Sequence, residues 1–285
     1  RSVLGFFARH QKADGSLGRM PWWNFVDWVP AWRGGVPPSS ASGSSAPLDL
    51  QLLLAYQWAA ELEDAHGMPA LAVAYRGEAD RLSRSIVQLY WDPARGLFAD
   101  TPDKRDFSQH TNALAVLAKV KTGAEARQIV ERTLSDKRLS QATIYFRYYL
   151  HLAMREVGLG DRYLDMLDTW REMIAQGSTT WAEWSGPQVR SECHAWGSSP
   201  NVELLRTVLG VDSAAPGWKK VVVRPNLGKL SRVSGSVPHP AGEIAARFEL
   251  RDGRLSGEIT LPAGVAGEFE WHGIRRQLRP GKNII

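Results

Sequence analysis

Aromatic and acidic residues gather in one long irregular stretch, residues 177–200, with the sequence GSTTWAEWSGPQVRSECHAWGSSP. Within it, Glu183 lies between Trp181 and Trp184. An indole offers a flat apolar face and one N–H donor, which suits the C–H faces and hydroxyl edges of a sugar ring. A carboxylate beside such rings can orient or deprotonate a water molecule. This is the chemistry that glycoside hydrolysis requires, although a loop glutamate can also be solvated or cap a helix.

A second irregular stretch, residues 13–47, carries Trp23 and Trp28 on either side of Asp27. Most tryptophans of the two stretches, Trp196 among them, lie outside the apolar faces of the predicted helices. Core packing alone does not explain this placement. We expect an aromatic-lined cleft where long loops meet at one end of a helical scaffold, with Asp27 as a second carboxylate. The alternative for Asp27 is a carboxylate tied to an arginine or to a backbone N–H.

Composition sets the outer bounds. With 285 residues and 44% hydrophobic content, the chain can form one large domain and a smaller one. No apolar run approaches the roughly 20 residues of a membrane span, so no membrane partner is expected. The formal charge is +5, but the Lys and Arg residues are scattered and form no dense basic run. This distribution argues against nucleic acid as a binding partner and leaves an anionic polysaccharide possible. The seven His are also scattered, so no metal and no other cofactor are expected.

Two patterns divide the chain. Up to about residue 212, apolar residues recur at helical spacing, and the connections between the predicted helices are short. The spacing predicts eight helices near 2–11, 48–65, 69–91, 108–120, 123–135, 142–157, 160–176 and 199–209. Beyond Pro216 the pattern changes to short alternating runs with an Arg251-Asp252-Gly253 turn, which predicts antiparallel strands. The expected domains are therefore residues 1–212 and a small β domain, residues 213–285.

Several segments carry a family resemblance. TTWAEW (179–184), SECHAWGSSP (191–200), VLGVDSAAPGWKKVVVRPNLG (208–228) and SGSVPHPAGEI (234–244) resemble the end of the catalytic domain and the following β domain of bacterial α-L-rhamnosidases. FSQHTNALAVLAKV and WNFVDW fit the same family, the inverting glycoside hydrolases of family seventy-eight. The resemblance implies an (α/α)6 six-hairpin barrel with the active site at one end, then an antiparallel β-sandwich.

The resemblance also assigns roles by position. Glu183 matches the general base, although here Ala182 stands between Trp181 and the glutamate, whereas many members have the glutamate directly after the aromatic residue. Glu192 is the alternative candidate for this general base. His194 matches a sugar-contacting histidine, with a role in fixing the loop backbone as its alternative.

The remaining matches concern substrate binding. Asp27 and Trp28, with Trp23, match an aromatic and acidic segment near the sugar site. His110, in SQHTN, opens a predicted helix and either lines the pocket or hydrogen-bonds the helix end. The three loop tryptophans are expected to contact the sugar as well; they are Trp181, Trp184 and Trp196.

One departure from the family stands out. Members carry an acidic segment upstream of the region that matches WNFVDW, and it supplies the general acid; nothing in this chain resembles it. Eight helices are also too few for six complete hairpins. We therefore expect either part of a longer enzyme, since the sequence does not begin with Met, or an incomplete barrel without the acid.

The primary hypothesis is a glycosidase that releases terminal α-L-rhamnose from glycosides or polysaccharides by inversion, with a rhamnose-containing carbohydrate as its partner. One alternative is a non-catalytic carbohydrate-binding protein that keeps the aromatic cleft. Another is a hydrolase or lyase for acidic polysaccharides on a similar helical barrel, which the basic pI of 9.4 favours. The sequence leaves the aglycone, the compartment and the oligomeric state open.

Overall fold

The helical pattern of the first half of the sequence forms six α-helices. A computed structural model describes residues 1–186 and 188–285, which form two compact units, residues 1–157 and 158–285. The helices of the first unit are α1 (Ser2–Ala8), α2 (Ala46–Ala65), α3 (Pro69–Tyr90), α4 (Gln109–Leu117), α5 (Gly123–Ser135) and α6 (Arg147–Glu156).

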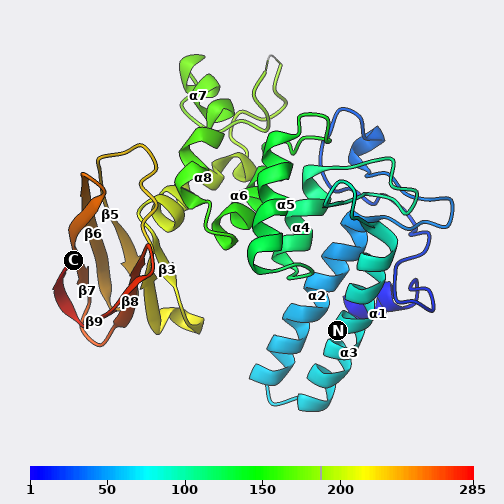
Figure 1. Cartoon of the computed structure of the whole chain (residues 1–285), viewed down its shortest axis with the longest axis horizontal. Helices are drawn as coiled ribbons and strands as arrows, with labels where there is room; N and C mark the ends of the chain where they lie inside the picture. The colour runs from blue at the N-terminus through cyan, green and yellow to red at the C-terminus, as the bar shows by residue number, and fades with distance from the viewer. Residues whose placement is uncertain (187) are drawn as a thin grey trace. The chain divides into compact units, whose positions relative to one another are not determined.

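The pair α2 and α3 forms an antiparallel hairpin that is clear in Figure 1. Gly67, with φ of +71°, ends α2 in the left-handed conformation that glycine adopts without strain. After α3 a short hairpin of β1 (Trp91–Asp92) and β2 (Leu97–Phe98) leads to α4. This hairpin was not predicted, because two-residue strands are too short to show a period.

The start of α4 explains the SQHTN motif. Ser108 is the N-cap and its hydroxyl accepts a hydrogen bond from the Thr111 backbone N–H at 3.2 Å. The Asn112 side chain accepts from the backbone N–H of Phe98 at 2.9 Å and donates to its carbonyl at 3.0 Å. The motif therefore fixes the end of the helix against β2.

The second unit begins with short helical pieces. They are a 3-10 helix (Gly160–Met166), α7 (Asp168–Ala175), a second 3-10 turn (Ala195–Ser198), α8 (Ser199–Glu203) and a π-helical turn (Leu204–Val208). The helix predicted over 160–176 is thus divided in two. Asp168 lies in the first turn of α7, where a carboxylate favours a new helix start.

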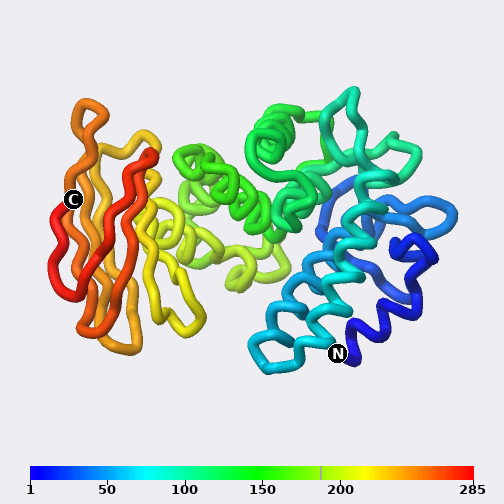
Figure 2. Tube along the Cα trace, turned by 60° about the horizontal axis from the view of Figure 1, so that its bottom comes forward, coloured from blue at the N-terminus to red at the C-terminus, as the bar shows by residue number. Residues whose placement is uncertain are grey.

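The strands of the second unit form two four-stranded sheets. The first has the order β10-β7-β6-β5 and the second has the order β3-β4-β8-β9. Figure 2 shows these strands side by side in yellow to red. Their bounds are β3 (Val211–Ser213), β4 (Lys220–Val223), β5 (Arg232–His239), β6 (Gly242–Arg251), β7 (Arg254–Leu261), β8 (Ala266–Trp271), β9 (Ile274–Leu278) and β10 (Gly281–Ile284).

Both sheets contribute to one hydrophobic core, as expected of a β-sandwich. Val221 and Phe269 from one sheet and Ile244 and Phe248 from the other are buried in it, and the two phenylalanine rings lie 6.1 Å apart. The predicted turn is confirmed, since Arg251 pairs with Arg254 across a two-residue loop.

One part of the predicted sheet geometry is wrong. The sandwich is not fully antiparallel, because β4 and β8 pair in parallel. Three antiparallel strands, β5 to β7, lie between them in the chain, so β8 runs in the direction of β4 again. The observed fold is a helical N-terminal part followed by a largely antiparallel β region. The predicted boundary after residue 212 falls inside the second unit, just after β3 begins, and stays a prediction.

Candidate active site

The loop that carries Glu183 is held closed by its own backbone. The N–H of Glu183 donates to the carbonyl of Ser191 at 2.9 Å, and the N–H of His194 donates to the carbonyl of Trp181 at 2.8 Å. The Thr180 hydroxyl donates to the backbone carbonyl of Glu192 at 2.5 Å. The two arms of the loop are therefore paired, and the glutamate has a defined place between them.

The Glu183 side chain is buried and bound by one arginine. Its two carboxylate oxygens accept from Arg190, at 2.5 Å from Nη2 and 3.2 Å from Nε. The carboxylate is 1% exposed, whereas the arginine side chain is 70% exposed. This bidentate pair fixes the orientation of the carboxylate.

Aromatic residues support this loop from both sides. Trp196 Nε1 donates to the Glu183 carbonyl at 3.2 Å, and its ring lies 4.2 Å from the ring of His194. Trp181 Nε1 donates to Asn201 Oδ1 at 3.0 Å, which ties the loop to α8. Trp184 is 42% exposed. The structure thus brings the five predicted residues of this loop together. Trp181 and Trp196 anchor it, while Trp184 is exposed.

Sequence reasoning missed a close contact beneath the loop. The Gly197 carbonyl accepts from Trp170 Nε1 at 2.7 Å. A Cβ atom at position 197 would lie 2.5 Å from the carbonyl oxygen of Ala182, closer than real Cβ contacts. Only glycine fits there without moving the segment that carries Glu183. The HAWG sequence was the available signal, since a buried glycine beside aromatic residues indicates a close backbone approach.

Asp27, in the first unit, is fully buried and accepts four hydrogen bonds. One oxygen accepts from the Trp28 backbone N–H at 2.9 Å and from the Thr143 hydroxyl. The other accepts from His110 Nε2 at 2.7 Å and from the Thr143 backbone N–H at 2.8 Å. With every strong acceptor position used, Asp27 joins two loops and the start of α4. This geometry favours the backbone-tied alternative over direct contact with a sugar.

His110 has a similar environment. Its ring is buried, 4.5 Å from the ring of Trp32 and 4.3 Å from that of Phe146. The bond to Asp27 uses Nε2, and no hydrogen-bond partner faces Nδ1 among the described residues. A buried ring between two aromatic side chains positions its neighbours rather than lining an open pocket. Its hydrogen bond goes to Asp27 and not to the helix end, which Ser108 caps.

Trp23 and Trp28 form an open aromatic cluster with Phe25. The Phe25 ring lies 5.1 Å from the first tryptophan ring and 4.9 Å from the second. Trp23 is 62% exposed and its Nε1 donates to the Gly34 carbonyl at 2.7 Å. Trp28 is 37% exposed. These exposed rings belong to the first unit, whereas Glu183 and its neighbours belong to the second. Contact of Trp23 and Trp28 with a sugar stays a prediction.

Two further properties concern possible partners. Across residues 1–186 and 188–285, no three or more His, Cys, Asp and Glu side chains are arranged to hold a metal ion. No helix in the same residues is long and apolar enough to span a bilayer.

Comparison with known proteins gives a consistent result. Residues 210–281 match the family model described as the bacterial alpha-L-rhamnosidase C-terminal domain. The fold is similar to that of a GH78 family rhamnosidase of Bacillus sp. GL1, with 26% identity and a TM-score of 0.82 over 95% of this chain and 30% of that one. The chain is thus similar in sequence and fold to α-L-rhamnosidases, and its residues 210–281 to their C-terminal domain.

Two other rhamnosidases extend this similarity. The chain is 27% identical over 132 residues to an alpha-L-rhamnosidase of Alteromonas sp. (strain LOR), a match to 41% of this chain and 14% of that protein. An alpha-L-rhamnosidase of Streptomyces avermitilis, solved in complex with L-rhamnose, shares the fold at 16% identity, with a TM-score of 0.77 over 98% of this chain and 29% of that one. This chain thus spans less than a third of the length of these rhamnosidases, which are glycosidases.

Proposed function

We propose that the natural full-length protein is an inverting glycosidase that releases terminal α-L-rhamnose. The observation that carries this proposal is the similarity to a rhamnosidase over 95% of the chain. The loop with Glu183 supports it, because a carboxylate is held there among indoles and an imidazole. In this view the helical part belongs to an (α/α)6 six-hairpin barrel, and the β domain begins after residue 212.

Glu183 acts as the general base in this mechanism. Inversion needs two carboxyl groups roughly 6.5–9.5 Å apart, so that a water molecule fits between the base and the sugar. Arg190 holds the glutamate in one orientation and releases an oxygen when water binds. The carboxylate then takes the proton of that water as it attacks the anomeric carbon on the face opposite the leaving oxygen.

The other predicted site residues contact the sugar or hold their neighbours in place. We assign sugar contact to His194 and Trp184, whose polar ring atoms have no partner among the described residues. The exposed faces of Trp23 and Trp28, in the first unit, are a separate candidate surface for sugar. The methyl group and C–H face of rhamnose pack well on such rings. Asp27 and His110 position their neighbours, because four donors already surround the Asp27 carboxylate. We therefore do not assign Asp27 as the general acid.

A binding protein without catalysis is the second candidate. It is favoured by one observation, the pairing of both Glu183 oxygens with Arg190, because a carboxylate that stays in this pair cannot take a proton from water.

The test uses the natural full-length protein with 4-nitrophenyl α-L-rhamnoside. We expect hydrolysis, with β-L-rhamnose as the first anomer seen by NMR, before mutarotation. An α-L product would contradict inversion. Binding of the rhamnoside without any hydrolysis would support the second candidate.

A further inference from the structure

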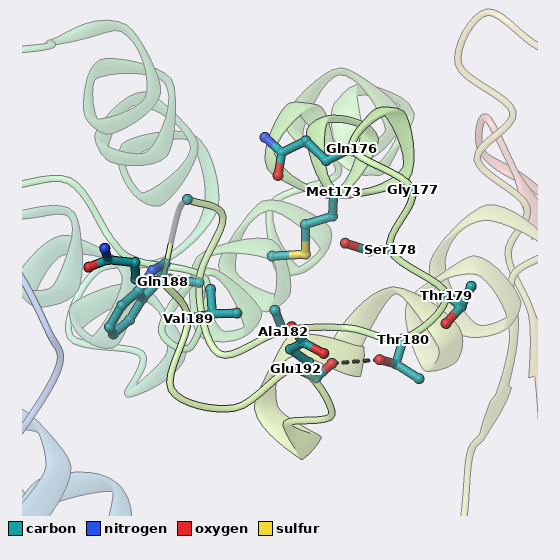
Figure 3. A pocket seen from close by; sticks show the side chains of 12 residues that line it. Met173, Gln176, Gly177, Ser178, Thr179, Thr180, Ala182, Gln188, Val189 and Glu192 are labelled. Carbon is teal, nitrogen blue, oxygen red and sulfur yellow. Dashed lines mark hydrogen bonds between the residues drawn. The ribbon is translucent and has the colours of Figure 1, made fainter.

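Two cavities of the second unit differ in their charged residues. The one behind the Glu183 segment, shown in Figure 3, has a volume of about 400 Å³; its lining includes Glu192 but no Lys or Arg. A larger groove, of about 570 Å³, lies on the sheet β10-β7-β6-β5 and is lined by Arg232 and Arg247 among others. Both volumes are within the range of ligand sites. Of the two, the groove on the sheet is the one that offers cations to a ligand.

Strand alternation places the charged residues of this groove on the outer face of the β-sandwich. In β6, Ala246 and Phe248 are buried in the core, so Arg247 and Glu249 point to the opposite face. The register sets Arg232 of β5 directly opposite Glu249. Figure 1 shows β5, β6 and β7 side by side, and the lining extends to β10. Four strands spaced ~4.8 Å apart span about 14 Å, so the groove is long enough for more than one sugar ring.

The outer face of this sheet carries an excess of positive charge. Its outward strand positions hold five cations and three carboxylates among the described residues: Arg232, Arg247, Arg251, Arg254 and Lys282 against Glu243, Glu249 and Glu258. The outward strand positions of the other sheet hold two cations and three carboxylates: Lys220 and Arg275 against Asp212, Glu268 and Glu270. The excess therefore belongs to the sheet with the groove, and it favours an anionic ligand.

The arginines of the groove have donors to spare. No hydrogen bond or ion pair joins the Arg232 side chain to the described residues. Arg247 donates through Nη2 to Glu258 Oε2 at 2.8 Å, and its Nη1 is unused. Glu258 also pairs with Lys282 at 2.6 Å, so two cations balance this one carboxylate. A guanidinium matches a carboxylate in both charge and shape, because it can donate two parallel hydrogen bonds.

The remaining lining distinguishes among anionic ligands. Ser234 and Ser256 carry hydroxyls without a partner among the described residues, and a hydroxyl can both donate to and accept from a sugar. Phe248, the aromatic residue of the lining, is buried in the core, so it offers no ring on which a nucleobase could stack. The carboxylates between the arginines also repel closely spaced phosphates.

From these observations we infer that the groove binds a glycan that carries carboxylate groups, such as a chain of uronic acids. Its carboxylates pair with Arg232 and Arg247, and its hydroxyls meet the two serines. This site belongs to the β domain and does not use Glu183, so the inference is independent of the proposed function.

The test is calorimetric titration of the 285-residue chain with hexagalacturonate and with its methyl ester, which has the same sugars without their charges. We expect the acid to bind at least about tenfold more tightly than the ester, and more weakly at high salt. Arg232→Gln with Arg247→Gln should lower the affinity for the acid at least about tenfold. Arg275→Gln with Arg276→Gln, on β9, is the matched control, because it also removes one arginine paired with a glutamate and one other exposed arginine.

A gain of affinity supplies a second readout. Glu249→Gln removes a negative charge from the groove and should strengthen binding, which a loss of folding cannot do. Equal affinity for acid and ester, equal effects of the two double substitutions, or no binding by the natural full-length protein would overturn the inference. Tighter binding of double-stranded DNA than of hexagalacturonate would also overturn it. So would loss of hexagalacturonate binding in Glu183→Gln, because the glycan would then occupy the loop. None of these measurements depends on hydrolysis of a rhamnoside.

Discussion

Two buried carboxylates of this chain have opposite environments. Asp27 accepts four hydrogen bonds from groups that cannot leave, two of them backbone N–H groups. Glu183 has one side-chain partner, and the side chain of that arginine is mostly in solvent. A carboxylate of the first kind holds structure together, whereas one of the second kind can exchange its partner for water. This difference supports the proposed roles of Glu183 as base and of Asp27 as a positioning residue.

Substituting Asp27→Asn tests its structural role. The amide NH₂ would face two of the four donors, so the chain should lose about 2–4 kcal/mol of unfolding free energy. Urea titration of the 285-residue chain measures this loss. Asp80→Asn, at an exposed position on α3, is the matched control and should change little. Equal stability of the two variants would show that the four bonds contribute nothing.

At the residue scale, the sequence predicted Glu183 and its aromatic neighbours because they are adjacent in the chain. It left Asp27 undecided, since the donor that decides its role, Thr143, lies 116 residues away. Arg190 was missed for a related reason: it pairs with Glu183 across a loop, and no regular period relates the two positions.

Among the elements, the loop that carries Glu183 depends on close packing between its two arms. The contact between Gly197 and Ala182 leaves no room for a side chain. Any added atom must displace the segment that carries Glu183, and misplacement of a catalytic group by about 1 Å can cost 10²-fold in rate.

Gly197→Ala should therefore lower kcat/KM of the natural full-length protein by at least about tenfold on an aryl α-L-rhamnoside. Gly186→Ala in the same loop is the control, because its Cβ would meet only Trp184, at an ordinary distance of 3.5 Å. If the two variants behaved alike, the tight contact would not position Glu183.

The first turn of α2 contains a group with a shifted titration. Burial raises the pKa of Asp49 from 3.8 to about 7, although Tyr90 Oη and the Leu17 backbone N–H donate to it. Below pH 4 both native and unfolded states hold the proton. Between pH 4 and 7 only the unfolded chain releases it, so Asp49 lowers the stability of the native state as pH rises through this window.

Asp49→Asn removes this titration. We expect the unfolding free energy of the wild type, relative to the variant, to fall by more than about 1 kcal/mol between pH 4.5 and 7.5, since one pKa unit corresponds to 1.36 kcal/mol. Urea titrations at the two pH values give the difference. A constant difference would contradict a raised pKa.

At the scale of the whole molecule, local sequence patterns predicted some features of the fold and not others. Each of the eight predicted helices overlaps an α-helix of the described residues, although the one predicted over 160–176 is divided, and the Arg251-Asp252-Gly253 turn was predicted. Such features depend on residues close in sequence. The parallel pairing of β4 with β8 and the division after residue 157 depend on contacts between distant segments, which periodicity does not report.

The 285-residue chain by itself should cleave natural rhamnosides poorly. The relatives are about three times longer, and Asp27, the acid candidate within the chain, is surrounded by donors. Sugar leaving groups need protonation, whereas nitrophenolate departs without it. We expect at most weak, Glu183-dependent release of nitrophenol and no release of glucose from a rhamnosyl-glucose disaccharide. Efficient disaccharide cleavage would show that the chain contains its own acid.

The central claim is that Glu183 is the base of a rhamnosidase. Its most direct test is kcat of Glu183→Gln in the natural full-length protein with 4-nitrophenyl α-L-rhamnoside, beside Glu172→Gln on the exposed face of α7 as control. We predict a loss of at least about 10²-fold in kcat with KM largely kept, because a general base contributes 10²–10⁴. The control should keep its activity. Near wild-type turnover of Glu183→Gln would contradict the claim and make Glu192 the residue to test.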